Sequence, residues 1–244
     1  MSIASEITRL QGVKSDILTA IADKCVTVPA GSALDDCPVL ISSIPAGSNY
    51  KVIGGKEYRT VVMPDGKIWL AENLDFKFCN IGGSGTPSTP NAWYYNDNET
   101  TYGWSGYKCG LLYNWYAAKV LNDHRSELCP GWHVPSDAEW NSLFTACGGI
   151  LVAGTKLKAL DGSAGQGFPT NWNGTDEYGF GVLSTGYCSN GSFYNSSDYA
   201  GFWSANEYSS TKAYDIRFNT SASVSLGNSY KADGICVRLV RDAT

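Results

Sequence analysis

The first residues of the chain carry hydrophobic side chains at the spacing of a coiled-coil helix. Intervals of four and three residues alternate along this series, and Lys14 is its one polar member. The positions are Ile3, Ile7, Leu10, Lys14, Ile17 and Ile21. Three heptads are too short to form a stable isolated helix. We therefore expect this helix to pack against copies of itself, in a homo-oligomer such as a trimer, or else against its own domain.

A second amphipathic stretch follows, and a linker ends it. Ser32 is placed to cap a short helix that has two Asp residues in its first turn, where the helix dipole favours acidic side chains. A run of Pro, Gly and Ser then extends to Ser48 and is typical of a linker. The pattern predicts a helical oligomerisation or attachment segment over residues 1–48 and a separate domain over residues 49–244.

Beyond this linker the hydrophobic period changes to the alternation of strands. Two alternating runs flank the residues Pro64–Gly66, which predicts a hairpin. Residues 110–121 have a helical pattern, and Ser136 with Glu139 has the sequence of a capping box at the start of a helix that Gly148 ends. The remaining strands are short and are joined by Gly- and Asn-rich loops. We expect one α+β domain with two helices, small antiparallel sheets and long loops.

The last strands separate polar from apolar side chains. Alternation predicts a hairpin whose apolar side faces the core, through Tyr214, Ile216, Phe218, Ala222, Val224 and Leu226. Its polar side then faces solvent, through Asp215, Arg217, Asn219, Ser221, Ser223 and Ser225. A closing strand follows with Ile235, Val237 and Leu239 on a buried face and with Cys236 and Arg238 on the other.

Composition and charge disfavour several classes of protein. The net charge is −5 and no cluster of Lys and Arg occurs, so we expect no nucleic-acid partner. No window is apolar enough to span a membrane, and the start has no signal-peptide core, so we expect no membrane insertion and no cleaved export signal. The 8 cysteines include no CxxC pair, which argues against a zinc knuckle. We expect most of them to be buried as small hydrophobic side chains. The alternative is one or two disulfides, if the protein matures outside a cell.

Several motifs in order along the chain resemble those of one family. They are GKIWLAENL at 66–74, GLLYNWYAA at 110–118, CPGWHVPSDAEWNSL at 129–143, GTKLKAL at 154–160, GTDEYGFGVLSTGY at 174–187, FWSANEY at 202–208 and GICVRLVRD at 234–242. The sequence resembles the Fibrobacter succinogenes major paralogous domain family. This resemblance implies a C-type lectin-like fold, in the branch related to the formylglycine-generating enzyme. Residues 3–45 separately resemble a segment common in bacteriophage tail and fibre proteins.

The resemblance also implies a source of sequence variation. Members of this family fused to phage-type tails serve as variable proteins of diversity-generating retroelements. There, miscopied template adenines turn AAC and AAT codons into codons for Asn, Ser, Tyr, Asp and others, but never for Lys, Glu, Gln, Trp or Met. Half of the 50 positions from Tyr187 to Cys236 are Asn, Ser, Tyr or Asp. An ordinary Ser- and Asn-rich surface is the alternative interpretation.

We infer that the polar positions of this region form a ligand-binding surface. Tyr, Ser and Asn are also the residues that antibody binding loops use. The candidate residues are Tyr187, Asn190, Ser192, Tyr194, Asn195, Tyr208, Asp215, Arg217, Asn219, Ser221, Ser223, Ser225, Asn228, Ser229, Tyr230 and Asp233. Four residues that adenine miscopying cannot produce are expected to belong to the constant framework: Trp203, Glu207, Lys212 and Lys231.

We expect neither catalysis nor a required cofactor. The enzymes related to this family use a pair of reactive cysteines near the C-terminus, and here Cys188 and Cys236 have no closely spaced counterpart. His133 stands before a helix, where a structural role is expected. The loop residues Asn171, Asn173, Asp176 and Glu177 offer oxygen ligands for a structural Ca²⁺, or form Asx turns of their own.

Together these features predict a binding protein without turnover. We expect a receptor-binding adhesin of a phage or prophage tail, diversified by a retroelement, with a host cell-surface protein or glycan as its ligand. Its location would be the virion tail. The alternative is a module of the same family that is not diversified, at the bacterial surface or secreted, and that recognises glycan or protein.

Overall fold

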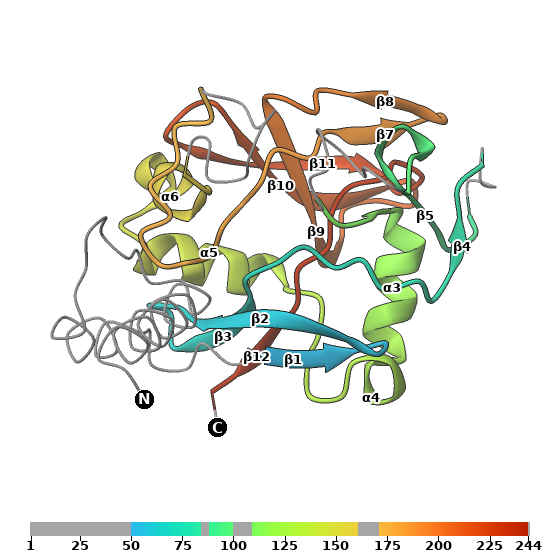
Figure 1. Ribbon diagram of the computed structural model, residues 1–244, viewed down its shortest axis with the longest axis horizontal. Coiled ribbons are helices and arrows are strands. Elements are labelled where there is room, and N and C mark those ends of the chain that lie inside the picture. The colour runs from blue at the N-terminus through green and yellow to red at the C-terminus, as the bar shows by residue number, and fades with distance from the viewer. Residues whose placement is uncertain (1–49, 84–87, 100–108, 161–170, 244) are drawn as a thin grey trace, which may run out of the picture. The chain divides into compact units, whose positions relative to one another are not determined.

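The computed structural model describes residues 50–83, 88–99, 109–160 and 171–243 (Figure 1). All of them belong to one unit, Asn49–Thr244. The helical and oligomeric predictions for residues 1–48 lie outside the described residues. None of the described helices is long and apolar enough to cross a membrane.

The first strands of this unit and its last strand form one antiparallel sheet. The order is β1 (Tyr50–Ile53), β2 (Lys56–Val62), β3 (Lys67–Leu70) and β12 (Val240–Asp242). The turn between β2 and β3 confirms the predicted hairpin. Gly66 has a φ of +80°, a conformation that favours glycine, and Asp65 accepts hydrogen bonds from the backbone of Lys67 at 3.0 Å and from Trp69 Nε1 at 3.1 Å.

Four α-helices occur in the described part of the chain, where the sequence predicted two. They are α3 (Trp115–Asp123), α4 (Arg125–Leu128), α5 (Asp137–Ala146) and α6 (Ile150–Leu157). The capping box of α5 is confirmed, since Ser136 Oγ accepts from Glu139 N and Glu139 accepts in return from Ser136 N. Helix α3 begins later than predicted because the Asn114 side chain caps it by accepting from Ala117 N at 2.9 Å.

Helix α6 lacks the sequence signals that identify a helix. Its N-cap is Gly149, which has no capping side chain, and a glycine, Gly154, lies in its second turn. The structure explains that glycine, because a Cβ on Gly154 would lie 2.6 Å from the carbonyl oxygen of Ala222. The close approach of α6 to the β10–β11 turn thus requires a residue that weakens the helical pattern.

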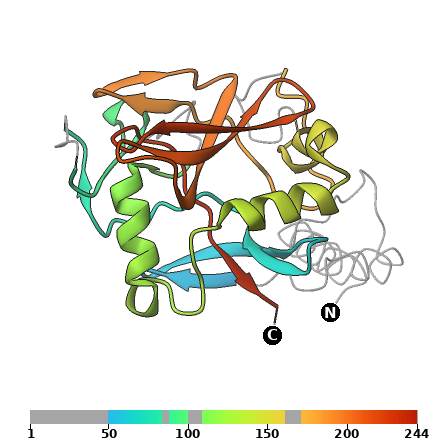
Figure 2. The same cartoon turned by 180° about the vertical axis from the view of Figure 1, so that it is seen from behind.

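The remaining strands form three further small sheets. The orders are β11 (Val224–Tyr230), β10 (Lys212–Asn219), β9 (Tyr199–Glu207); β4 (Asn80–Ile81), β5 (Asn91–Trp93), β6 (Leu112–Tyr113); and β7 (Tyr187–Ser189), β8 (Ser192–Tyr194). A short 3₁₀ helix, η2 (Tyr95–Asp97), follows β5. Figures 1 and 2 show β7–β11 at one end of the unit and the sheet of β1, β2, β3 and β12 at the other. The α+β class is therefore confirmed.

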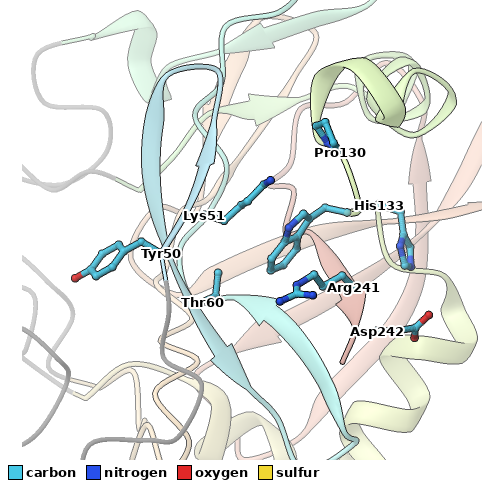
Figure 3. Close-up of a pocket in the computed structure, with 9 residues that line it drawn as sticks. Tyr50, Lys51, Thr60, Pro130, His133, Arg241 and Asp242 are labelled. Carbon is cyan, nitrogen blue, oxygen red and sulfur yellow. The ribbon is translucent and has the colours of Figure 1, made fainter. Parts of the chain in front are cut away.

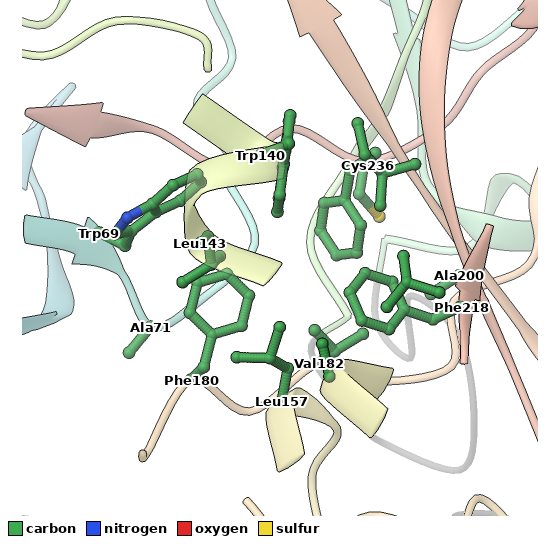
Figure 4. Close-up of a cluster of buried hydrophobic side chains, with 14 of the residues drawn as sticks. Trp69, Ala71, Trp140, Leu143, Leu157, Phe180, Val182, Ala200, Phe218 and Cys236 are labelled. Atoms are coloured by element: carbon green, nitrogen blue, oxygen red, sulfur yellow. The ribbon is translucent and has the colours of Figure 1, made fainter. Parts of the chain in front are cut away.

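Aromatic side chains from distant parts of the chain meet in the core (Figure 4). Trp140 of α5 packs against Trp69 of β3, with ring centroids 4.8 Å apart, and against Phe202 of β9 at 5.8 Å. Phe202 in turn contacts Phe218 of β10 at 5.9 Å. Edge-to-face and tilted pairs of this kind stabilise a core beyond the area they bury. The core thus joins both ends of the unit through α5.

The segment Ile235–Leu239 is buried on both sides, whereas the sequence predicted one buried face. It hydrogen-bonds to several elements at once. Ile235 N donates to Tyr113 O of β6 at 3.0 Å, Cys236 O accepts from Trp203 N of β9, and Leu239 O accepts from Leu70 N of β3. Because neighbours surround it, no side remains for solvent.

Arg238 is the charged side chain within this buried segment, and it is fully buried. Its guanidinium donates to Asn73 Oδ1 at 2.8 Å and to the carbonyl oxygens of Leu70, Phe180 and Gly181. The cation also lies over the Phe180 ring at 4.5 Å. Burial lowers the pKa of Arg238 to about 9, so the group is still charged at neutral pH.

Replacement of Arg238 tests this arrangement. Arg238→Ala leaves three buried carbonyl oxygens and Asn73 without their donor, so we expect the free energy of unfolding to fall by about 3 kcal/mol or more. The exposed Arg125→Ala is the matched control, with an expected loss below about 0.5 kcal/mol. Chemical denaturation measures both variants. Equal stability of the two would contradict the structural role of Arg238.

Candidate ligand-binding site

The β10–β11 hairpin, Lys212–Tyr230, carries nine of the sixteen candidate residues. Its register pairs Ile216 with Leu226, Arg217 with Ser225 and Phe218 with Val224. Ile216, Phe218 and Val224 are buried as predicted, and Ser225 is exposed as predicted. The predicted separation of core and solvent faces therefore holds for the middle of the hairpin.

Two positions on the predicted core face are instead exposed. Leu226 is 45% exposed, and Ala222 is also exposed. Strand β11 is the edge of its sheet, so Leu226 has a neighbouring strand on one side only. The backbone of Ala222 lies against α6, where its carbonyl accepts from Thr155 N at 3.1 Å, but its side chain is not covered.

Asp215 was predicted to face solvent, and its side chain is completely buried. Arg217, two residues along the same face, folds back over it and donates from Nε to Asp215 Oδ2 at 2.8 Å. Ser229 Oγ donates to the same oxygen at 2.9 Å. Gly227 lies opposite Asp215 and leaves room for this arrangement, since a Cβ there would lie 2.6 Å from Arg217 Cζ. Arg217 thus covers Asp215, and the lack of a side chain at Gly227 gives Arg217 the room to do so. Strand alternation alone predicts that Asp215 is exposed.

A cavity of about 260 Å³ opens beside this ion pair. It is lined by Tyr187, Asn195, Tyr199, Arg217, Ser229, Asp233 and Ile235. Five of these seven were predicted from the sequence, and they come from different strands and loops. Tyr199 was missed although it lies in the same Asn-, Ser- and Tyr-rich region, and that composition could have identified it. We call this the β7–β11 cavity.

Tyrosine rings form one wall of the β7–β11 cavity. Tyr187 stacks with Tyr194 at 5.2 Å and meets Tyr199 edge-to-face at 5.4 Å. Burial, with the negative charge of Asp215, raises the pKa of the Tyr199 hydroxyl well above its usual range. That hydroxyl is therefore protonated at neutral pH and can donate a hydrogen bond to a ligand.

Charged groups supply the rest of the cavity's chemistry. Burial lowers the pKa of Arg217, but the hydrogen bond and charge of Asp215 outweigh it and raise that pKa. Its side chain is 37% exposed, so a permanent cation faces the cavity. Burial raises the pKa of the Asp233 carboxyl, and a hydrogen bond with Ser189 opposes the rise. The cavity thus offers a cation, a carboxyl group and hydroxyl groups within the space of one side chain or one sugar ring.

The other candidate residues lie around the cavity or beyond it. Asn190, Ser192 and Tyr194 are exposed on the β7–β8 hairpin. Tyr208 is exposed and meets Tyr214 edge-to-face, and Tyr230 is exposed under the cation of Lys212. The remaining candidates off the cavity lie on β10 and β11 and at the turn between them: Asn219, Ser221, Ser223, Ser225 and Asn228. Of the sixteen, Asp215 alone is buried.

The turn between β10 and β11 is held by its backbone. Lys158 is fully buried, and its Nζ donates to the carbonyl oxygens of Asn219 at 2.7 Å and Ser221 at 2.8 Å. The same ammonium lies over the Trp172 ring at 5.0 Å. Because Lys158 binds main-chain atoms, the turn keeps its anchor whatever side chains positions 219 and 221 carry.

Residues expected to be constant have structural contacts. Trp203 is fully buried and donates from Nε1 to Tyr113 O at 2.7 Å. Lys231 is buried over the Trp115 ring at 4.9 Å and pairs with Glu207. Lys212 is partly exposed beside Tyr230. Three of the four expected framework residues are thus tied to the interior.

The expected metal and catalytic candidates have structural partners. Within the described residues, no group of three or more His, Cys, Asp or Glu side chains could hold a metal ion. Asp176 accepts from Gly181 N at 2.7 Å, and Glu177 pairs with Lys156 at 3.3 Å. His133 Nε2 hydrogen-bonds to Glu139 Oε1 at 2.8 Å, beside the capping box of α5.

The six cysteines within the described ranges behave mostly as buried hydrophobic side chains, as predicted. Cys109, Cys129, Cys147, Cys188 and Cys236 are buried, and Cys79 is partly buried. Burial raises the pKa of both Cys188 and Cys236 to about 11. Their thiolate forms are therefore scarce at neutral pH, and the thiolate is the reactive form.

Comparison with known families agrees with the sequence motifs. The model of the Fibrobacter succinogenes major domain matches residues 63–241. The chain belongs to this family. The match extends from the end of β2 into β12, so this major domain includes the β7–β11 cavity and the buried Arg238. No curated protein matches the sequence.

Gly227 tests how the wall of the cavity is built in this family member. In Gly227→Ala the new Cβ collides with Arg217 and displaces it from buried Asp215, so we expect a loss of about 1–3 kcal/mol in unfolding free energy. Ser225→Ala, exposed on the same strand, is the control, with a change below about 0.5 kcal/mol.

A double-mutant cycle isolates the collision from the effect of glycine itself. In an Arg217→Ala background the close contacts with Arg217 are absent and only the one with Asp215 Oδ1, at 2.8 Å, remains, so Gly227→Ala should cost less there than in the original protein. Strictly additive losses would show that Arg217 does not lie over Gly227.

Proposed function

We propose that this protein binds ligands through the β7–β11 cavity and the exposed residues around it, and that these residues are variable. The observation that carries the proposal is the distribution of the candidate residues. Fifteen of the sixteen are exposed or partly exposed, and five of them line one cavity. The apolar residues that alternate with them on β10, Ile216 and Phe218, are buried. Recognition and folding are thus assigned to different side chains.

The chemistry of the cavity suits recognition without turnover. Tyr187 and Tyr199 in the wall, with Tyr194 stacked on Tyr187 outside it, offer large rigid surfaces, and Asn195 and Ser229 offer adaptable hydrogen bonds. Its volume of about 260 Å³ is just below the range of about 300–1,000 Å³ typical of small-molecule pockets. A single protruding group of a larger surface ligand, such as a side chain or a sugar ring, fits such a site.

We infer that a diversity-generating retroelement produces the variation. The composition from Tyr187 to Cys236 supports this, since half of its positions are residues that an Asn codon reaches through adenine miscopying. Buried Lys231 and Trp203, which such miscopying cannot produce, are held by the interior. Backbone anchors such as Lys158 support a turn whose side chains differ from one variant to the next.

The wider setting follows from the family and from the N-terminal sequence. We propose a C-type lectin-like fold for the domain, in keeping with its α+β class and its family. The heptad pattern of residues 3–21 supports a homo-oligomer, and a trimer would multiply weak single-site affinity through effective concentration. We propose a receptor-binding adhesin of a phage or prophage tail, whose ligand is a protein or glycan of the host cell surface.

Substitution of the exposed residues tests the proposal. Ser192→Tyr, Tyr194→Ser and Ser225→Asn together replace three candidates with residues that an Asn codon reaches. We expect the unfolding free energy to fall by less than about 1.5 kcal/mol in total, because each is a surface change. Adsorption of the labelled protein to a panel of bacterial strains should change, with strains gained or lost.

The core control substitutes two buried positions of the β10–β11 hairpin, which also carries Ser225. Phe218→Ser and Val224→Ser carry equally polar residues to the core, and each should cost about 3 kcal/mol or more. Surface and core variants with equal losses would contradict the separation of folding from recognition. A folded surface variant that adsorbs to the same strains as the original would contradict binding at this face.

The alternative is a family member that is not diversified and that recognises one glycan or protein at the bacterial surface. The same cavity would serve it, and natural copies of the gene would then carry the same residues at the candidate positions.

A further inference from the structure

A second cavity lies in the sheet at the end opposite the β7–β11 strands. Its volume is about 420 Å³, within the range of small-molecule sites. Strands β1, β2 and β12 contribute Lys51, Thr60 and Arg241, and the segment Pro130–His133 closes it (Figure 3). We call it the β1–β12 cavity. None of the sixteen candidate residues lines it.

Two cations of this cavity have no anionic partner among the residues that the structure describes. Neither Lys51 nor Arg241 makes a hydrogen bond or ion pair through its side chain to any residue within the described ranges. Figure 3 shows both side chains among those that line the cavity. The acidic residue in the wall, Asp242, pairs with Lys67. The protein as a whole has a net charge of −5. Lys51 and Arg241 nevertheless make this cavity locally positive, because both line it without an ion pair to a described residue.

The ring of Trp132 orients one of these cations. The Arg241 guanidinium lies 5.6 Å from its centroid, and the ring itself is buried. Stacking on an aromatic face fixes the plane of a guanidinium and leaves its N–H groups pointing outward from its edge. Those N–H groups are therefore prepared for an acceptor with two oxygen atoms, and the ammonium of Lys51 adds a second positive charge.

We propose that the β1–β12 cavity binds a phosphate group carried as a monoester. A guanidinium fork matches two phosphate oxygens, and a lysine ammonium complements the remaining charge. The cavity is much larger than a phosphate ion, which leaves space for the group that the ester carries. This site is separate from the proposed adhesin function and does not depend on it.

The test uses the full chain with glycerol 3-phosphate and with inorganic phosphate, at constant ionic strength. Calorimetry gives the affinity, and amide chemical shifts locate the site. We expect both ions to shift residues 50–52, 131–133 and 240–242, with the ester bound more tightly. Tighter binding of inorganic phosphate than of the ester would support the site for the free ion and overturn its assignment to an ester.

Charge-removing variants test the two cations. Lys51→Gln with Arg241→Gln should weaken phosphate binding about tenfold or more, because two charge-assisted contacts are lost. The control is Lys119→Gln with Lys156→Gln, which also removes two positive charges, but from lysines that lie outside the cavity and pair with Asp123 and Glu177. It should change the affinity for phosphate less than about twofold.

Conservative variants separate charge from fold. Lys51→Arg with Arg241→Lys keeps both charges, so phosphate binding should persist, weakened by loss of the stacked fork. Thermal unfolding confirms that each variant is folded. The proposal is overturned if Lys51→Gln with Arg241→Gln binds phosphate as the original does, if the shifts lie elsewhere, or if acetate binds as tightly as phosphate.

Discussion

The buried guanidinium of Arg238 is the interaction on which this domain depends. It joins the C-terminal segment to the end of β3, to Asn73 in the loop that follows and to the segment before β7, where it binds Phe180 and Gly181. The same segment hydrogen-bonds to β3, β6 and β9 through its backbone. A cation in a core is tolerated only when such partners surround it. The segment that carries it therefore has a fixed path, and Ile235 reaches the wall of the β7–β11 cavity from that path.

This arrangement places the determinants of stability beneath the candidate binding residues. Arg238, Lys158 and Lys231 all donate to backbone carbonyl oxygens from buried positions, so they hold strands and turns without using the exposed side chains. Ser192 and Tyr194 of β8 and Ser225 of β11 are exposed, and none of these three buried cations contacts their side chains. Surface changes of this kind usually cost less than about 0.5 kcal/mol each. A scaffold built this way supports a variable face.

The sequence predicted those features that depend on local chemistry. The capping box at Ser136, the turn at Gly66 and the buried face of Ile216 and Phe218 each follow from residues close together in the chain. Features set by distant contacts were missed or wrong. Asp215 is covered because Gly227 on another strand admits Arg217, and Leu226 is exposed because β11 is an edge strand. The alternation of polar and apolar residues along one strand predicts neither the burial of Asp215 nor the exposure of Leu226.

The most direct test of the central claim is the sequence of the DNA beside this gene and its natural copies. We expect a nearby template repeat that matches the codons for Tyr187 to Cys236, with mismatches confined to template adenines and falling at the exposed candidate positions. The codons for the buried residues Trp203, Ile216, Phe218 and Lys231 should match the template. A repeat with mismatches at these buried positions, or natural copies that do not vary at the exposed ones, would contradict the proposed separation of a variable face from a constant core.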